Sequence, residues 1–331
     1  MAPESVDGRC NGMGRQAPRL ALAEGQPWAL PSEDAVPDHR HLLQTWSLVV
    51  PAESAFTHLT AARHLGWWLP PLPADLPVFV AVAEASPRPR RQGLRASRHP
   101  TVPSWQVFDG VRTTTAAETL LACARDLELL DMVVLIDAAL AAGHCSFDDV
   151  ARVANSGRRG APMLRKALRH ADSRSESAWE TMLRMLHVAA DIPVEPQVEI
   201  SDETGAFLAR GDLHILGTRT LHEYDGSHHL DRRNQRDDLR RMRRLSRKGW
   251  TRHGYTSHEV LHEAVGIVRD GDLALRRPHR PERVRAWHAQ LSRSLFSASG
   301  TALFRQGIGL YTPGGAPTGR DRPSAPLLDD R

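Results

Sequence analysis

Cysteine is scarce in this chain, and long apolar runs are absent. The 331 residues include three cysteines, Cys10, Cys123 and Cys145, and no two of them form a CxxC pair. This argues against a disulfide framework or a structural zinc site and favours a reducing compartment. The apolar stretches fall far short of the ~18 residues that a membrane-spanning helix needs, and the N-terminus lacks a charged segment followed by a long apolar one. The sequence therefore predicts a cytoplasmic protein that does not enter a membrane.

Net charge is also small, but it is unevenly distributed. The formal net charge is +4, whereas residues 231–248 hold nine Arg or Lys against three Asp. A one-signed helix suits contacts with a phosphate backbone. A solvated amphipathic helix explains the pattern as well, because Leu239, Met242 and Leu245 recur once per turn. The predicted nucleic-acid contacts are Arg236, Arg240 and Arg243.

The length allows two domains, and the N-terminal half is predicted to be a small, mostly helical α/β accessory domain over 41–171. Residues 1–40 are rich in Pro, Gly, Ser and Arg without periodicity, which is typical of a disordered leader. Thr115 and Glu118 resemble a capping box. The patterns predict helices over 54–66, 119–124, 127–142, 147–154 and 163–170, and strands over 77–82 and 94–98.

The C-terminal half reads as an alternation of helices and strands. A domain over 173–275 is followed by a helical extension over 276–311, with a helix at 284–295, and by a disordered tail over 312–331. Within the domain the patterns predict a helix at 177–190, strands at 194–200, 206–215 and 219–224, a helix at 232–248, a strand at 250–255 and a helix at 257–268.

Acidic residues occupy two neighbouring predicted strands. Asp212 interrupts an apolar strand, and Glu223 and Asp225 lie at the end of the next one. Residues two apart on a strand share a face, so Glu223 and Asp225 project together and Asp212 can reach them. Converging carboxylates repel one another unless a divalent cation lies between them, which predicts a Mg²⁺ or Mn²⁺ site suited to phosphodiester hydrolysis. Asp225-Gly226 is also an ordinary turn signal, and Asp212 also fits an exposed strand position beside Arg210.

Four pieces of sequence together resemble a known family. They are Ser175–Glu180 opening a helix, Arg210–Leu213 in a strand, Glu223–Gly226 followed by His228-His229, and Arg236-Asp237 through Gly249-Trp250. In this order they resemble the Vsr-related branch of the PD-(D/E)XK nuclease superfamily, and more narrowly domain of unknown function 559. The resemblance implies an α/β (α+β) restriction-endonuclease-like core of order αβββαβ with a mixed central sheet. Residues 41–171 more weakly resemble the N-terminal part of AbiEi-type antitoxins, although the winged helix usual there is not visible.

The resemblance also implies roles for particular residues. Asp212 would be the first metal ligand and Glu223 the second acid, with Glu180 on the first helix or Asp225 completing the shell. The superfamily pattern has a lysine where Asp225 stands, so this departure leaves the general base unassigned. His228 or His229 could fill that role, because a histidine titrates near neutrality.

Two positions carry alternatives. Glu180 fits equally well as the N3 residue of a capping box with Ser177, where it would bond the cap backbone N–H, and Glu176 lies one turn away as another candidate acid. Gly211 before Asp212 either weakens the strand or marks a close backbone approach.

The leading hypothesis is a Mg²⁺-dependent endodeoxyribonuclease, a hydrolase whose partner is DNA. The alternative is a catalytically inactive nuclease-fold module of antitoxin or regulatory type that binds DNA or protein, for which the N-terminal half is a candidate surface. An RNA-directed nuclease is a weaker third hypothesis, because no base-stacking motif favours RNA.

Overall fold

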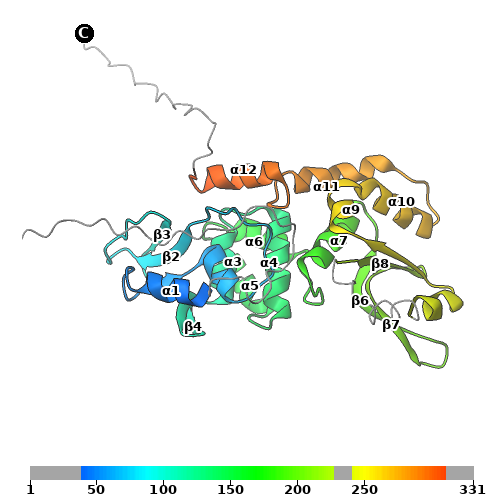
Figure 1. Cartoon of the computed structure of the whole chain (residues 1–331), viewed down its shortest axis with the longest axis horizontal. Coiled ribbons are helices and arrows are strands. Elements are labelled where there is room, and N and C mark those ends of the chain that lie inside the picture. The colour runs from blue at the N-terminus through cyan, green and yellow to red at the C-terminus, as the bar shows by residue number, and fades with distance from the viewer. Residues whose placement is uncertain (1–38, 227–240, 311–331) are drawn as a thin grey trace, which may run out of the picture.

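A computed structural model describes residues 39–226 and 241–310, which form two mixed β-sheets with most of the helices between them (Figure 1). The described residues do not include the predicted tail or most of the predicted leader. They also leave out four predicted site residues, His228, His229, Arg236 and Arg240. Helix α1 (His39–Ser47) begins inside the predicted leader, so that boundary was placed two residues too late. The mixed α and β class is confirmed.

The N-terminal sheet has five strands in the order β3-β2-β1-β5-β4. They are β1 (Ala55–Phe56), β2 (Val78–Ala83), β3 (Leu94–His99), β4 (Trp105–Phe108) and β5 (Val111–Thr114). The helix predicted over 54–66 is wrong at its start, because β1 pairs with β2 and β5 before α2 (His58–His64) begins. The β4–β5 hairpin was not predicted. Its signal was the Asp109-Gly110 turn, where both residues have positive φ.

Four helices cover the middle of the chain, close to the predicted positions. They are α3 (Ala116–Cys123), α4 (Leu129–Ala141), α5 (Phe147–Ala154) and α6 (Ala161–Leu168). Thr115 is the N-cap of α3 but makes no side-chain cap bond, so the capping-box prediction there is wrong. Glu118 instead accepts two hydrogen bonds from Arg158, at 2.9 and 2.8 Å, because an ionised guanidinium is a stronger donor than a helix N–H.

The second sheet has the order β6-β7-β8-β9, with β6, β7 and β8 antiparallel and β9 parallel to β8. The strands are β6 (Val194–Ser201), β7 (Phe207–Ile215), β8 (Thr220–Tyr224) and β9 (Thr251–Tyr255), and α7 (Ala178–Ala189) precedes them. Residues 241–247, within the predicted helix 232–248, are helical. The helix predicted over 257–268 is instead two, α9 (Ser257–His262) and α10 (Ala264–Ala274), because Glu263 at φ −123° breaks it.

The C-terminal extension runs back along both halves, as the orange elements at the top of Figure 1 show. It comprises η2 (Pro281–Arg283), α11 (Val284–Leu291) and α12 (Ala298–Gly307). The helix predicted over 284–295 ends at Leu291, because the buried carboxylate of Asp131 on α4 accepts from the Ser294 hydroxyl at 2.6 Å and the Leu295 amide at 3.1 Å. One apolar cluster runs from Leu59 to Ile308. None of the helices within 39–226 and 241–310 is long and apolar enough to cross a membrane.

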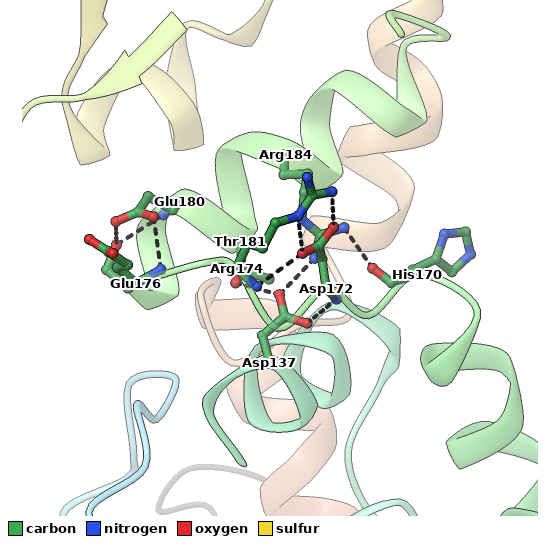
Figure 2. Close-up of polar contacts among 9 residues, drawn as sticks. Asp137, His170, Asp172, Arg174, Glu176, Glu180, Thr181 and Arg184 are labelled. Atoms are coloured by element: carbon green, nitrogen blue, oxygen red, sulfur yellow. Dashed lines mark hydrogen bonds and ion pairs between the residues drawn. The ribbon is translucent and has the colours of Figure 1, made fainter. Parts of the chain in front are cut away.

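A buried polar junction joins α4 to α7. Asp137 is fully buried and accepts hydrogen bonds from Thr181 at 2.7 Å, from Arg184 at 2.6 Å and from the Asp172 amide at 2.8 Å (Figure 2). Arg184 also donates to the carbonyl oxygen of His170 at 2.6 Å. The helix that opens the second sheet is therefore fixed to the N-terminal half by a charge pair whose polar atoms are largely satisfied.

Candidate functional site

Asp212 on β7 lies in a mostly buried position beside two other acids. Its Oδ2 accepts a hydrogen bond from the Tyr224 amide at 3.0 Å, which joins β7 to the end of β8. Burial, the charge of Glu180 and that of Glu223 raise the pKa of Asp212 to about 7. A nearby cation would stabilise the ionised form of a carboxyl in this environment, because it would offset both the cost of burying the charge and the repulsion from the other acids.

Glu223 on β8 is 3% exposed and is held by two arginines. Arg241 Nη2 lies 2.6 Å from Glu223 Oε1, and Arg252 Nε lies 2.5 Å from Glu223 Oε2. Arg252 also donates through Nη2 to Asp225 Oδ1 at 2.5 Å. Glu223 and Asp225 therefore share a face, as their spacing predicts, and Arg252 bridges them.

Sequence reasoning missed Arg241 and Arg252. Arg252 reaches the acids because β9 runs parallel to β8 with Glu223 opposite Gly254, a register that spacing alone does not reveal. The available signal was Gly254, since a glycine inside a strand often marks a close approach. A Cβ at Gly254 would lie 1.7 Å from Asp225 Oδ2. Arg252 thus supplies positive charge beside Asp225, but a guanidinium stays protonated and cannot act as a base.

Glu180 caps the first turn of α7. Its carboxylate accepts from the Glu176 amide at 2.8 Å (Figure 2). It also accepts from the Ser177 hydroxyl at 3.0 Å and from Gln197 Nε2 at 2.8 Å. The amide it bonds is that of Glu176 rather than that of the cap residue Ser177, which corrects the expected pairing. Glu176 itself lies in an exposed ion pair with Arg210 at 2.6 Å. Glu180 therefore acts on Asp212 through its charge while its oxygens hold the helix start.

Gly211 marks a close approach. A Cβ there would lie 2.8 and 2.9 Å from the methyl groups of Leu221. The glycine lets β7 and β8 pack closely just before Asp212. Of the two interpretations of Gly211, the close backbone approach is therefore the one that describes it.

A buried histidine pair lies directly behind the acids. His222 precedes Glu223 on β8 and so faces the opposite side. His187 Nε2 on α7 lies 2.8 Å from His222 Nδ1, and the Tyr255 hydroxyl lies 3.4 Å from His222 Nε2. Burial lowers the pKa of His187 to about 4 and that of His222 well below its usual range. Both rings are neutral parts of the core at neutral pH.

Of the remaining residues predicted for the site, the structure describes Arg243. Arg243 is exposed and makes no hydrogen bond or ion pair with the rest of the described chain. His228, His229, Arg236 and Arg240 lie in the segment 227–240, outside the described residues. The roles predicted for them stay predictions.

The oxygen donors are of the kind that Mg²⁺ takes. Asp212 keeps Oδ1 free of hydrogen bonds to other described residues, whereas both Glu223 oxygens face guanidinium groups. Within the residues that the structure describes, no group of three His, Cys, Asp or Glu side chains is arranged to hold a metal. The donor chemistry therefore fits a hard cation. Glu223 can act as a ligand only if a guanidinium leaves it, and Arg241, at 26% exposed against 13% for Arg252, is the more accessible of the two.

Comparisons of the chain with protein-family models, with curated proteins and with solved structures find no match. Function is therefore argued from the chemistry of the site.

Proposed function

We propose that this chain is a Mg²⁺- or Mn²⁺-dependent endonuclease of PD-(D/E)XK type that hydrolyses DNA phosphodiester bonds. The observation that carries the proposal is Asp212, a mostly buried carboxyl beside Glu180 and Glu223 whose pKa is raised to about 7. Keeping such a group next to two further acids is costly without a cation, and perturbed carboxyls of this kind cluster at functional sites.

Asp212 and Glu223 would hold the metal, and Asp225 would stay oriented by Arg252. A bound metal would lower the pKa of its water and offset charge on the scissile phosphate. Arg241, once released from Glu223, would donate charge-assisted hydrogen bonds to the phosphate. His228 or His229 would assist proton transfer, and Arg236, Arg240 and Arg243 would contact the DNA backbone.

A second candidate is a nuclease-fold module that binds DNA or protein without cleavage. It is favoured by one observation: Arg241 and Arg252 already neutralise both oxygens of Glu223, and Asp225 stands in place of the motif lysine. Two arginines could replace the metal permanently and leave a positive surface for phosphate.

The test is cleavage of supercoiled plasmid with Mg²⁺ or Mn²⁺ by wild type, Asp212→Asn and Glu223→Gln. Glu199→Gln, an exposed acid on β6, is the matched control. Nicking that needs metal, disappears in both site variants and persists in the control supports the endonuclease. Absence of cleavage by folded protein that still retards DNA on a gel contradicts it and favours the binding module.

Metal uptake is measured separately from cleavage. Mn²⁺ should raise the melting temperature of wild type and of Glu199→Gln, and leave that of Asp212→Asn unchanged, because bound ligand stabilises only the folded state that holds it. An equal rise in all three proteins would place the metal elsewhere.

A further inference from the structure

A cavity of about 700 Å³ lies in the N-terminal half, among β2, β3 and the end of α3. This volume is typical of small-ligand sites. Its lining contains six arginines and a single acid, Asp126. The six are Arg88, Arg90, Arg91, Arg95, Arg125 and Arg159.

The arginines come from segments far apart in sequence. The loop after β2 supplies three of them, β3 supplies Arg95, the residues after α3 supply Arg125, and the turn before α6 supplies Arg159. That turn is held in place by Gly160, whose φ is +92° and where a Cβ would lie 2.6 Å from the Leu121 carbonyl oxygen. Two basic loops that look unrelated in the sequence therefore converge on one cavity.

Most of these guanidinium groups form no ion pair within the described residues. Arg88, Arg90, Arg91 and Arg159 are exposed at the mouth of the cavity and make no hydrogen bond or ion pair with any other described residue. Arg158, next to Arg159, shows the contrast, because it donates two hydrogen bonds to the Glu118 carboxylate.

Two arginines lie deeper in the cavity. Arg95 donates to the carbonyl oxygen of Ile308. Arg125 has a buried Nε with no partner among the described residues. A buried donor without an acceptor costs free energy, which an incoming oxygen would recover.

The one acid does not balance the charge. Asp126 Oδ2 lies 3.3 Å from Nε2 of the buried His58, so its charge is partly directed away from the arginines. Burial lowers the pKa of Arg125; the charge of Asp126 opposes this shift, and the charges of Arg159 and Arg158 add to it. The cavity thus holds mutually repelling cations that an anion would stabilise.

We propose that this cavity binds the oligophosphate group of a small molecule, such as a nucleoside di- or triphosphate. Guanidinium groups match phosphate oxygens in paired hydrogen bonds, and this many arginines need several anionic oxygens to satisfy them. The arginines surround a hollow rather than forming a stripe, which favours a free molecule over a nucleic-acid strand. Phe79 and Leu94 in the lining offer apolar contact to the remainder of the ligand. The proposal is independent of nuclease activity.

The test is isothermal titration of the full chain at physiological ionic strength with inorganic tripolyphosphate, with ATP and with a single-stranded oligonucleotide. Tripolyphosphate and ATP should bind once per chain. Arg91→Gln and Arg159→Gln should each weaken binding at least tenfold, because each removes charge-assisted hydrogen bonds. Arg285→Gln, an exposed arginine on α11, should leave binding unchanged.

A second readout separates binding from folding. Without ligand, Arg159→Gln should melt at a temperature equal to or above that of wild type, because it removes repulsion. The proposal is overturned if wild type fails to bind tripolyphosphate, if the cavity variants bind as wild type does, or if Arg285→Gln weakens binding equally. Binding of the oligonucleotide alone overturns the assignment to a small molecule.

Discussion

At the scale of single residues, two neighbouring acids are treated differently by their surroundings. Glu223 is almost fully buried yet meets two guanidinium groups, whereas Asp212 receives one backbone N–H, the repulsion of nearby acids and only the more distant charge of Arg241. Burial alone does not set the state of a carboxyl, because the charges facing it decide whether ionisation is favourable. Asp212 is therefore the residue whose chemistry is most sensitive to pH and to cations.

Asp212→Asn should stabilise the metal-free protein at high pH. The folded pKa of about 7 lies above the unfolded value near 3.9, so wild type loses stability as pH rises between them. Asparagine cannot ionise and still accepts from the Tyr224 amide. In urea unfolding, the free energy of unfolding of the variant should exceed that of wild type by up to about 4 kcal/mol at pH 8, and the gain should nearly vanish by pH 4. A difference that is equal at both pH values would contradict this account.

At the scale of elements, α7 is fixed by polar contacts on two sides, to α4 through Asp137 and to β8 through His187. Each contact is buried, so each depends on its partner being present and in the right protonation state. Both contacts therefore position the sheet that carries the acids.

Asp137→Ala should destabilise the protein strongly. The change leaves Arg184 buried without its counter-charge and Thr181 without its acceptor, which costs about 3 kcal/mol or more. Chemical unfolding checks this. The matched control is Arg152→Ala, which breaks the exposed Arg152–Asp149 pair on α5 and should leave stability nearly unchanged. Similar losses in the two variants would show that Asp137 does not anchor α7.

Acid should weaken the contact between α7 and β8. The folded pKa of His187, about 4, lies below its unfolded value near 6.5, so its stabilisation is present above pH 6.5 and is lost as pH falls to about 4. Wild type should lose about 2–3 kcal/mol over this range through this residue. His187→Gln should show a shallower loss. His258→Gln, at an exposed site, should lose stability with falling pH as steeply as wild type does. A shallower loss in this control would show that His187 is not the source of the pH dependence.

At the scale of the whole molecule, the C-terminal extension joins the two halves. One apolar cluster includes residues from α2 to Ile308, and Asp131 on α4 binds the segment between α11 and α12. Arg293 pairs with Glu128, and Arg305 with Asp75. A core shared in this way couples the folding of both sheets.

Calorimetry should therefore show one cooperative unfolding transition. Ser294→Ala removes a hydrogen bond to the buried Asp131 and should lower the melting temperature of that single transition, at a cost of about 1–2 kcal/mol. Two separate transitions in wild type, or a variant that splits one transition into two, would show that the halves fold independently. Ser299→Ala, at an exposed hydroxyl on α12, serves as control.

The sequence by itself determined the elements whose patterns are local. The strands around Asp212 and Glu223, the start of α7 and the shared face of Glu223 and Asp225 follow from period-two and period-3.6 patterns and from side-chain caps. Short strands such as β1, and the break at Glu263, escaped prediction because pairing partners and packing decide them.

Which charged side chains meet depends on the three-dimensional arrangement of the elements. Arg252 reaches Glu223 through the parallel register of β9, and Arg91 and Arg159 meet around one cavity although they lie in separate loops. The physical reason is that electrostatic interactions depend on distance and burial in space, neither of which is encoded by separation along the chain. The types of charged residue are visible in the sequence, but which of them form pairs depends on the folded structure.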